Sequence, residues 1–122
     1  MAFSASSTFK RLVNSVYVDT NVGITAQTNI TGAAATFYGA EVDNRMNQSR
    51  AVFLKLYDAG SASNNTDPTL LLYVPPGEVG RFVFAEGVSF ATALTLLVTT
   101  TASTSSSPRK PENNVAVRVL AV

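Results

Sequence analysis

The acidic residues best placed for acid–base chemistry are Glu41 and Asp43. They are separated by one residue, so a β-strand would put both carboxylates on one face, about 7 Å apart. General acid–base catalysis would require such a pair to be held in a cleft. Here the pair lies at the end of an expected strand, close to Arg45 and Arg50. We interpret the two acids as solvated residues where the following loop begins, with their charges balanced by the nearby arginines.

A second acidic stretch surrounds an asparagine-rich loop. Asp58 and Asp67 flank Asn64 and Asn65, and loops of this composition can supply oxygen ligands to Ca²⁺. The spacing matches no calcium-binding loop, and Asp and Asn are frequent in turns because their side chains hydrogen-bond to the local backbone. We therefore expect no metal site, and no cofactor-binding residues were found.

Nucleophilic catalysis lacks its usual partners in this chain. Histidine and cysteine are both absent, which removes the commonest general base, the commonest metal ligand and every thiolate. Ser107 and Lys110 are the closest approach to a Ser–Lys pair, but they lie in a loop with nothing to hold their geometry. The seven glycines are scattered and form no phosphate-binding loop. We predict that the protein is not an enzyme and that it has no catalytic residues.

The charge balance limits the kinds of partner. Nine basic and eight acidic residues give a net charge of +1, and only 14% of the residues are charged. This composition argues against nucleic acid and anionic membranes as partners. With 46% hydrophobic residues, it favours a protein that lies against other subunits. The start, MAFSASSTFKRL, lacks the pattern of an export signal, so we expect synthesis in the cytoplasm without a signal peptide.

The length of 122 residues suits one domain. Residues 1–8 are small and polar and are expected to form a flexible N-terminal arm, and residues 9–122 are expected to form one β-sandwich. Short runs rich in Val, Leu, Phe, Tyr and Thr predict about eight strands. They are expected at 9–18, 22–30, 35–42, 51–57, 69–74, 79–84, 88–90 with 93–100, and 115–122.

Turn residues separate these strands. Residues 19–21 predict a turn, and residues 85–87 predict a break between strands. Pro76 and Gly77 fit the second and third positions of a type II turn, which would join 69–74 and 79–84 as a hairpin. Gly39 predicts a bulge or a close backbone approach.

The side chains in the strand at 51–57 alternate well, and Lys55 is expected to point to water. Residues 101–114 predict a loop that is mobile or held by a neighbour. Together the elements predict an all-β fold, an antiparallel two-sheet sandwich of jelly-roll or immunoglobulin-like type. The number of strands does not choose between these two topologies.

Several segments between Ala51 and Val122 form a pattern that resembles a known class of proteins. They are VFLKLYDA, Asp67-Pro68, LLLYVPPGEVGRFVF, GVSFATALTLLVTTTA and NNVAVRVL. In this order they resemble small virion structural proteins of tailed bacteriophages, and the preceding TFYGAEVDN is fainter in its likeness. These motifs are structural rather than catalytic.

Among such proteins, capsid decoration or cement proteins look like the best fit. The resemblance implies a homo-oligomer, with a trimer favoured, that binds the major capsid protein on the exterior of the virion. An N-terminal arm would grip the shell, and the candidate capsid contacts are Phe3, Phe9, Lys10 and Arg11.

Two alternatives remain open at the level of the sequence. One is a tail, neck or fibre component of the same particles. The other is a carbohydrate-binding β-sandwich module, since sandwiches bind sugars on flat aromatic faces. The absence of Trp and the scattered Tyr residues argue against the sugar module.

Overall fold

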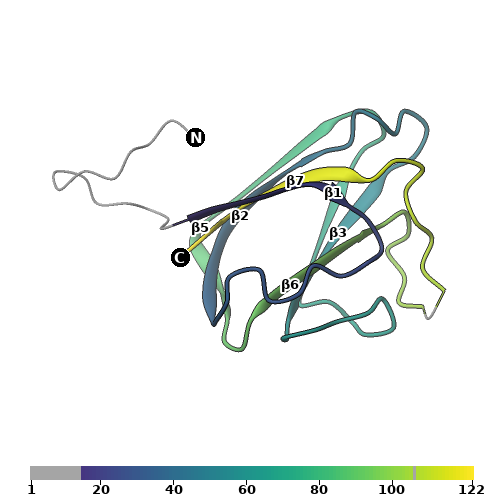
Figure 1. The fold of residues 1–122 in the computed structure, drawn as a ribbon. Helices are drawn as coiled ribbons and strands as arrows, with labels where there is room; N and C mark the ends of the chain where they lie inside the picture. The colour runs from purple at the N-terminus through teal and green to yellow at the C-terminus, as the bar shows by residue number, and fades with distance from the viewer. Residues whose placement is uncertain (1–14, 106) are drawn as a thin grey trace, which may run out of the picture.

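Two antiparallel β-sheets pack face to face in the computed structural model, which describes residues 15–105 and 107–122 (Figure 1). One sheet has the strand order β1-β7-β2-β5 and the other has the order β4-β3-β6. The strands are β1 (Ser15–Val22), β2 (Ala35–Asp43), β3 (Val52–Asp58), β4 (Leu70–Val74), β5 (Val79–Phe90), β6 (Leu94–Thr99) and β7 (Val115–Ala121). Among the described residues there is no helix. The predicted two-sheet sandwich is confirmed.

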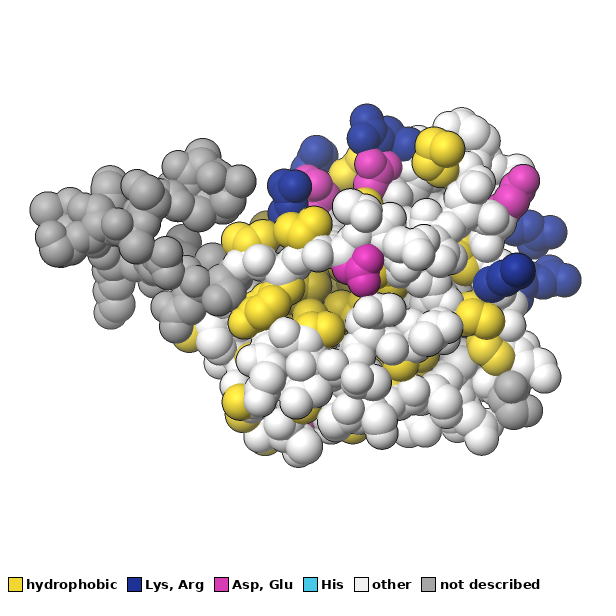
Figure 2. Space-filling view, viewed as in Figure 1, with side chains coloured by type: hydrophobic (Ala, Val, Ile, Leu, Met, Phe, Trp, Pro, Cys, Tyr) yellow, Lys and Arg dark blue, Asp and Glu magenta, His cyan; other side chains and the backbone are white. Residues whose placement is uncertain are grey.

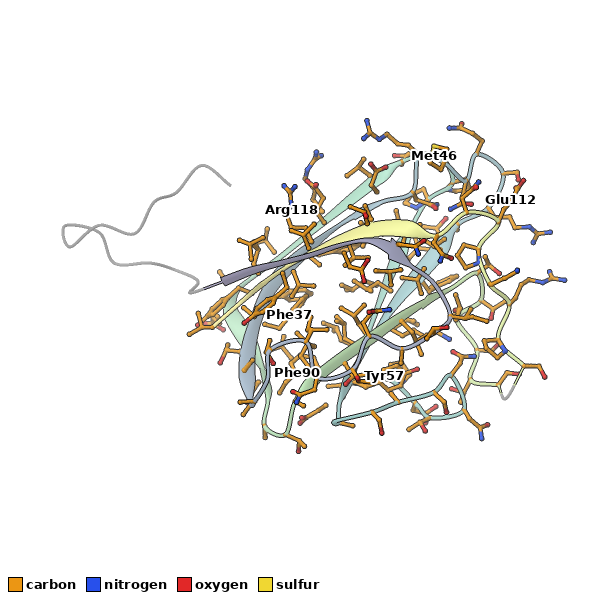
Figure 3. All side chains as sticks on the ribbon, viewed as in Figure 1. Phe37, Met46, Tyr57, Phe90, Glu112 and Arg118 are labelled. Atoms are coloured by element: carbon orange, nitrogen blue, oxygen red, sulfur yellow. The ribbon has the colours of Figure 1, made fainter. Side chains whose placement is uncertain are left out.

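The core lies between the two sheets and follows the two-residue alternation of the strands. In β7, Val115, Val117 and Val119 are buried, whereas Arg118 is exposed, as the sequence predicts. Phe37 is fully buried, and its ring centroid lies 6.1 Å from that of Phe90. Figure 3 shows both rings between the sheets and Arg118 pointing away from them.

The strand expected at residues 22–30 is only partly formed. Val22 ends β1, and the rest of the segment is an irregular edge beside β6. Gln27 and Leu96 exchange backbone hydrogen bonds of 2.7 and 3.0 Å, and the amide of Ile30 donates to the carbonyl of Leu94. Asn29 has a positive φ of 47°, which interrupts extended backbone at this point. The prediction of a regular strand is wrong, although the segment lies along the sheet edge.

The turn predicted at residues 19–21 is also wrong, because these residues belong to β1. The carboxylate of Asp19 accepts a hydrogen bond of 2.9 Å from the amide of Asn21. The register of β1 against β7 shifts between Asp19 and Val22. The local hydrogen bond therefore produces a bulge, not a chain reversal.

The predicted hairpin between β4 and β5 is wrong, although the turn between them has the expected conformation. Gly77 has φ of 68°, as the third position of a type II turn requires. However, β4 pairs with β3 and β5 pairs with β2, so this turn carries the chain from one sheet to the other. The amide of Gly77 donates to the carbonyl of Asn47, and the amide of Asn44 donates to the carbonyl of Glu78. These bonds hold the turn against the β2–β3 loop.

Strand β5 continues through the break that was predicted at residues 85–87. Its pairing with β2 passes from Val83, opposite Gly39, to Val88, opposite Phe37. The intervening residues form a large bulge in which Gly87 has φ of 78°. At Gly39 a side chain would overlap the carbonyl oxygen of Phe82, so the predicted close backbone approach is confirmed.

Candidate interaction surfaces

The four residues predicted to contact a capsid lie outside the described part of the chain. They are Phe3, Phe9, Lys10 and Arg11. The predicted arm, residues 1–8, lies outside it as well. Candidate surfaces are therefore built from residues 15–105 and 107–122.

The acidic pair at the end of β2 is engaged in ion pairs. The Arg81 guanidinium is 2.8 Å from a carboxylate oxygen of Glu41, and that of Arg45 is 2.7 Å from Asp43. Hydrogen bonds from the side chain and then the backbone of Arg45 lower the pKa of Asp43 to about 2. Each carboxylate is neutralised by its own arginine, which agrees with the charge-balanced interpretation, with Arg81 rather than Arg50 as one of the two partners.

The two aspartates around the asparagine-rich loop accept hydrogen bonds from different parts of the chain. Asp58 accepts bonds from three successive amides of the β5–β6 turn, of which that of Thr92, at 2.8 Å, is the shortest. These bonds, led by that from Thr92, lower the pKa of Asp58. Asp67 instead accepts a bond of 2.8 Å from the hydroxyl of Thr104. Within residues 15–105 and 107–122, no group of three or more acidic residues converges as a metal site would require.

Lys55 is buried, and the prediction that it points to water is wrong. Its side chain is 1% exposed, and it donates to Oδ1 of Asn64 and, at 2.9 Å, to the carbonyl of Ser103. Burial lowers the pKa of Lys55. Its neighbour across the ladder, Leu97, is also fully buried on this side of β6. Two loop segments, residues 59–69 and 101–105, therefore fold over the outer face of the β4-β3-β6 sheet.

The part of this outer face that the loops leave uncovered is aromatic and apolar. Leu71 and Tyr73 of the edge strand β4 are 41% and 52% exposed. Phe53 lies opposite Tyr73, with ring centroids 5.4 Å apart and planes inclined by 54°. We call these three residues the β4 patch. Their tilted rings do not form the flat aromatic platform expected of a sugar site.

The outer face of the other sheet carries an apolar row beside a charged row. Across the four strands, the row that contains the charges runs from the apolar Val18 to Arg118, Glu41 and Arg81, and the apolar row runs Val16, Leu120, Gly39, Val83. Val18 is 57% exposed and Val83 is 79% exposed. Exposed apolar side chains grouped in this way are typical of contact surfaces.

A groove opens between the two sheets where β1 faces the segment 23–30. Its volume is about 410 Å³. It is lined by Val16, Tyr17, Val18, Asp19, Val22, Gln27, Ile30, Leu96, Val117 and Val119. Figure 2 shows a hollow with apolar side chains at its floor on this face of the molecule. Asp19 and Gln27 are the polar residues, apart from the Tyr17 hydroxyl, in a lining that is otherwise apolar.

The sequence matches no known protein-family profile, and no curated protein matches it. Within the described residues, no helix with the length and hydrophobicity needed to cross a membrane is found.

Proposed function

We propose that this protein is a non-enzymatic structural protein of a tailed-bacteriophage virion, and specifically a capsid decoration protein that binds the outside of the assembled shell. The proposal begins from the resemblance carried by the segments between Ala51 and Val122. One structural contrast supports it best. The buried polar side chains are hydrogen-bonded within the fold, whereas apolar side chains are exposed on the outer faces of both sheets.

The buried polar side chains all serve to hold the fold together. They are Asn44, Asn47, Lys55, Asn64, Thr95 and Thr99. Each makes at least one hydrogen bond to a loop, a turn or another of these side chains. In the part of the chain that is described, the Tyr57 hydroxyl is the one buried side-chain nitrogen or oxygen without a hydrogen-bond partner. Polar groups used in this way favour a scaffold over a catalytic site.

The outer faces supply surface for binding a larger neighbour. The apolar row ending at Val83 and the β4 patch lie on opposite sheets, so two sides of the sandwich can contact proteins. A decoration protein that binds the assembled shell and not its free subunits stabilises the shell by mass action. Many copies on one particle would multiply a modest affinity. As a proposal, the capsid contacts are Phe3 in the N-terminal arm and Phe9, Lys10 and Arg11 directly after it, and the partner is the major capsid protein.

The strand order favours a jelly roll over an immunoglobulin-like topology within this proposal. The last strand, β7, lies between β1 and β2, and β6 lies between β3 and the segment 23–30. If that segment is counted as an eighth strand, two four-stranded sheets result, as in jelly rolls.

The decisive test uses particles with and without this protein. We expect particles that lack it to assemble but to break at a lower temperature or a milder osmotic shock, and added protein should restore resistance. Sturdy particles that fail to attach to cells would favour the alternative, a tail or fibre component. Particles that do not carry the protein at all would reject both roles.

A further inference from the structure

The side chains of Lys55 and Asn64 are in direct contact inside the protein. Nζ of Lys55 donates to Oδ1 of Asn64, and the two residues are 1% and 3% exposed. The carbon of the Asn64 carboxamide is one C=O bond, about 1.23 Å, from that oxygen. An amine held beside a carbonyl carbon is placed to attack it. Well-oriented groups in fixed proximity react as if present at an effective concentration of about 10⁵–10⁸ M.

The surroundings of Lys55 favour the neutral amine, which is its nucleophilic form. Its neighbours in the two strand ladders, Leu71 and Leu97, are both apolar. Within residues 15–105 and 107–122, no carboxylate forms an ion pair with Lys55. A buried ammonium group without a counter-ion is costly, and burial lowers the pKa of Lys55 for this reason. The share of neutral amine is therefore larger than for an exposed lysine.

The carbonyl oxygen of Ser103 bonds to both nitrogen atoms of the pair. It accepts a hydrogen bond of 2.9 Å from Nζ of Lys55 and one of 3.3 Å from Nδ2 of Asn64. A proton of the amine therefore has a short path to the amide nitrogen. The backbone amide of Ser105 donates to the carbonyl of Asn64, and its own carbonyl accepts from Nδ2. These bonds fix the orientation of the carboxamide against Lys55.

We propose that Lys55 and Asn64 join in an intramolecular isopeptide bond. Nζ of Lys55 bonds to Cγ of Asn64, the bond from Cγ to Nδ2 breaks, and one proton moves from Nζ to Nδ2, which leaves as ammonia. One amide replaces another, so the reaction needs no oxidant, cofactor or energy source. Loss of the ammonia to water opposes the reverse reaction. The hydrogen-bonded contact in the structure is the arrangement before the bond forms.

The new bond ties β3 covalently to the loop segment 59–69 and closes a ring of residues 55–64. The hydrogen that remains on Nζ still donates to the carbonyl of Ser103, so the segment 101–105 stays attached to the sheet. The inference does not depend on the virion role, because it concerns the isolated chain.

Mass spectrometry of the full-length protein, unfolded and then digested with trypsin, tests the bond. Trypsin cuts after Lys and Arg, and Lys55 is the one such residue between Arg50 and Arg81. We expect residues 51–81 as a single peptide, uncut at Lys55 because its amine has become an amide. This peptide should be lighter than its sequence by one ammonia. Separate peptides 51–55 and 56–81 of full mass, after prolonged incubation of the folded protein, would overturn the proposal.

Two variants and a control assign the loss of ammonia to this pair of side chains. Lys55→Arg keeps a positive charge, but its guanidinium stays protonated and is no nucleophile. Asn64→Ala removes the carboxamide. Each of these variants should abolish the loss of ammonia. Asn65→Ala is the matched control, since Asn65 is exposed beside Asn64 and its replacement should leave the loss unchanged.

An asparagine can also lose ammonia by closing a ring on its own backbone, and the digest of Lys55→Arg separates the two reactions. Trypsin releases residues 56–81 from this variant, and we expect that fragment to have its full mass. A fragment lighter by one ammonia would contradict the isopeptide bond, and so would an Asn65→Ala protein that no longer loses ammonia. Capsid binding is decided separately by the particle experiment.

Discussion

The ammonium group of Lys55 donates a hydrogen bond of 2.9 Å to the carbonyl of Ser103, across 48 residues of sequence. The Asn64 side chain accepts a second bond from Lys55 and donates to the carbonyls of Ser103 and Ser105. Two long polar loops are thereby joined above the β4-β3-β6 sheet. The buried amine bonds to both loops, and residues beside it on the same sheet face form the β4 patch.

Replacing this amine should release the loops. Lys55→Met keeps the aliphatic stem but leaves the acceptor atoms of Asn64 and Ser103 without their donor. We expect a loss of about 1–3 kcal/mol in the free energy of unfolding, measured by urea denaturation. Lys110→Met is the control, because Lys110 is exposed and should change stability by less than about 0.5 kcal/mol. Equal midpoints for the two variants would contradict the role given to Lys55.

The close approach at Gly39 predicts a different kind of sensitivity. Gly39→Ala would push a methyl group into the carbonyl oxygen of Phe82 across the β2–β5 ladder. Such overpacking typically costs about 1–3 kcal/mol, and here the obstructing atom is backbone, which moves less easily than a side chain. Gly60→Ala is the matched control, since nothing lies within 4 Å of the added carbon. Thermal unfolding of both variants checks the prediction, and a Gly39→Ala protein as stable as Gly60→Ala would refute it.

The carboxylate of Asp58 predicts an acid-sensitive turn. Its folded-state pKa is lowered by amide hydrogen bonds, led by that from Thr92, so in acid the unfolded state binds more protons than the folded state. The stability that Asp58 contributes is therefore present above about pH 4, the ordinary aspartate range, and is lost as pH falls through the lowered pKa. Urea midpoints measured between pH 2 and pH 6, a range chosen about the ordinary carboxylate pKa, should fall less steeply with acid for Asp58→Asn. Parallel curves would contradict this.

Alternation and turn chemistry were enough to predict the sandwich and its best strands. The buried valines of β7 around the exposed Arg118 follow the alternation. The predictions failed where the same local sequence is compatible with two structures. Gly77 fits the third position of a type II turn whether or not β4 and β5 pair with each other. Asp19 can stabilise a bulge as readily as a turn through its hydrogen bond to a backbone amide. Lys55 was misplaced because the loops that cover it come from distant parts of the chain. No alternation rule carries that information.

The candidate surfaces were harder still to predict from sequence. The segment 23–30 forms only a few backbone hydrogen bonds with β6, and the groove lies between this segment and β1. The groove depends on how β1, β6 and the segment 23–30 are placed relative to one another. The sequence of each element alone predicts only a strand. The four predicted capsid contacts remain predictions, since they lie before Ser15.

Asn47 predicts a coupling between the β2–β3 loop and the entry to β7. Its side-chain amide donates to Oδ1 of Asn44 and to the carbonyl of Asn113, both at 2.8 Å, and its own oxygen accepts from the amide of Asn113. Asn47 is 2% exposed and Asn44 is 0% exposed, so the bond between these two side chains has little access to water. Asn47→Ala leaves the partners of Asn47 unsatisfied, and we expect a loss of about 2–3 kcal/mol in the free energy of unfolding.

Asn47→Asp sharpens this test because it keeps the shape of the side chain and removes only the donor. The new carboxylate would face two acceptor oxygens inside the protein, so burial and repulsion should raise its pKa above the unfolded value of about 3.9. A raised pKa means that the folded state binds the extra proton. The variant should therefore be most stable below about pH 4 and lose stability as pH rises through the folded-state pKa, opposite in sign to the effect of Asp58. Urea midpoints of Asn47→Asp and Asn47→Ala against pH give the comparison, and an Asn47→Asp midpoint that did not fall relative to that of Asn47→Ala as pH rises would show that the amide donor is not needed there.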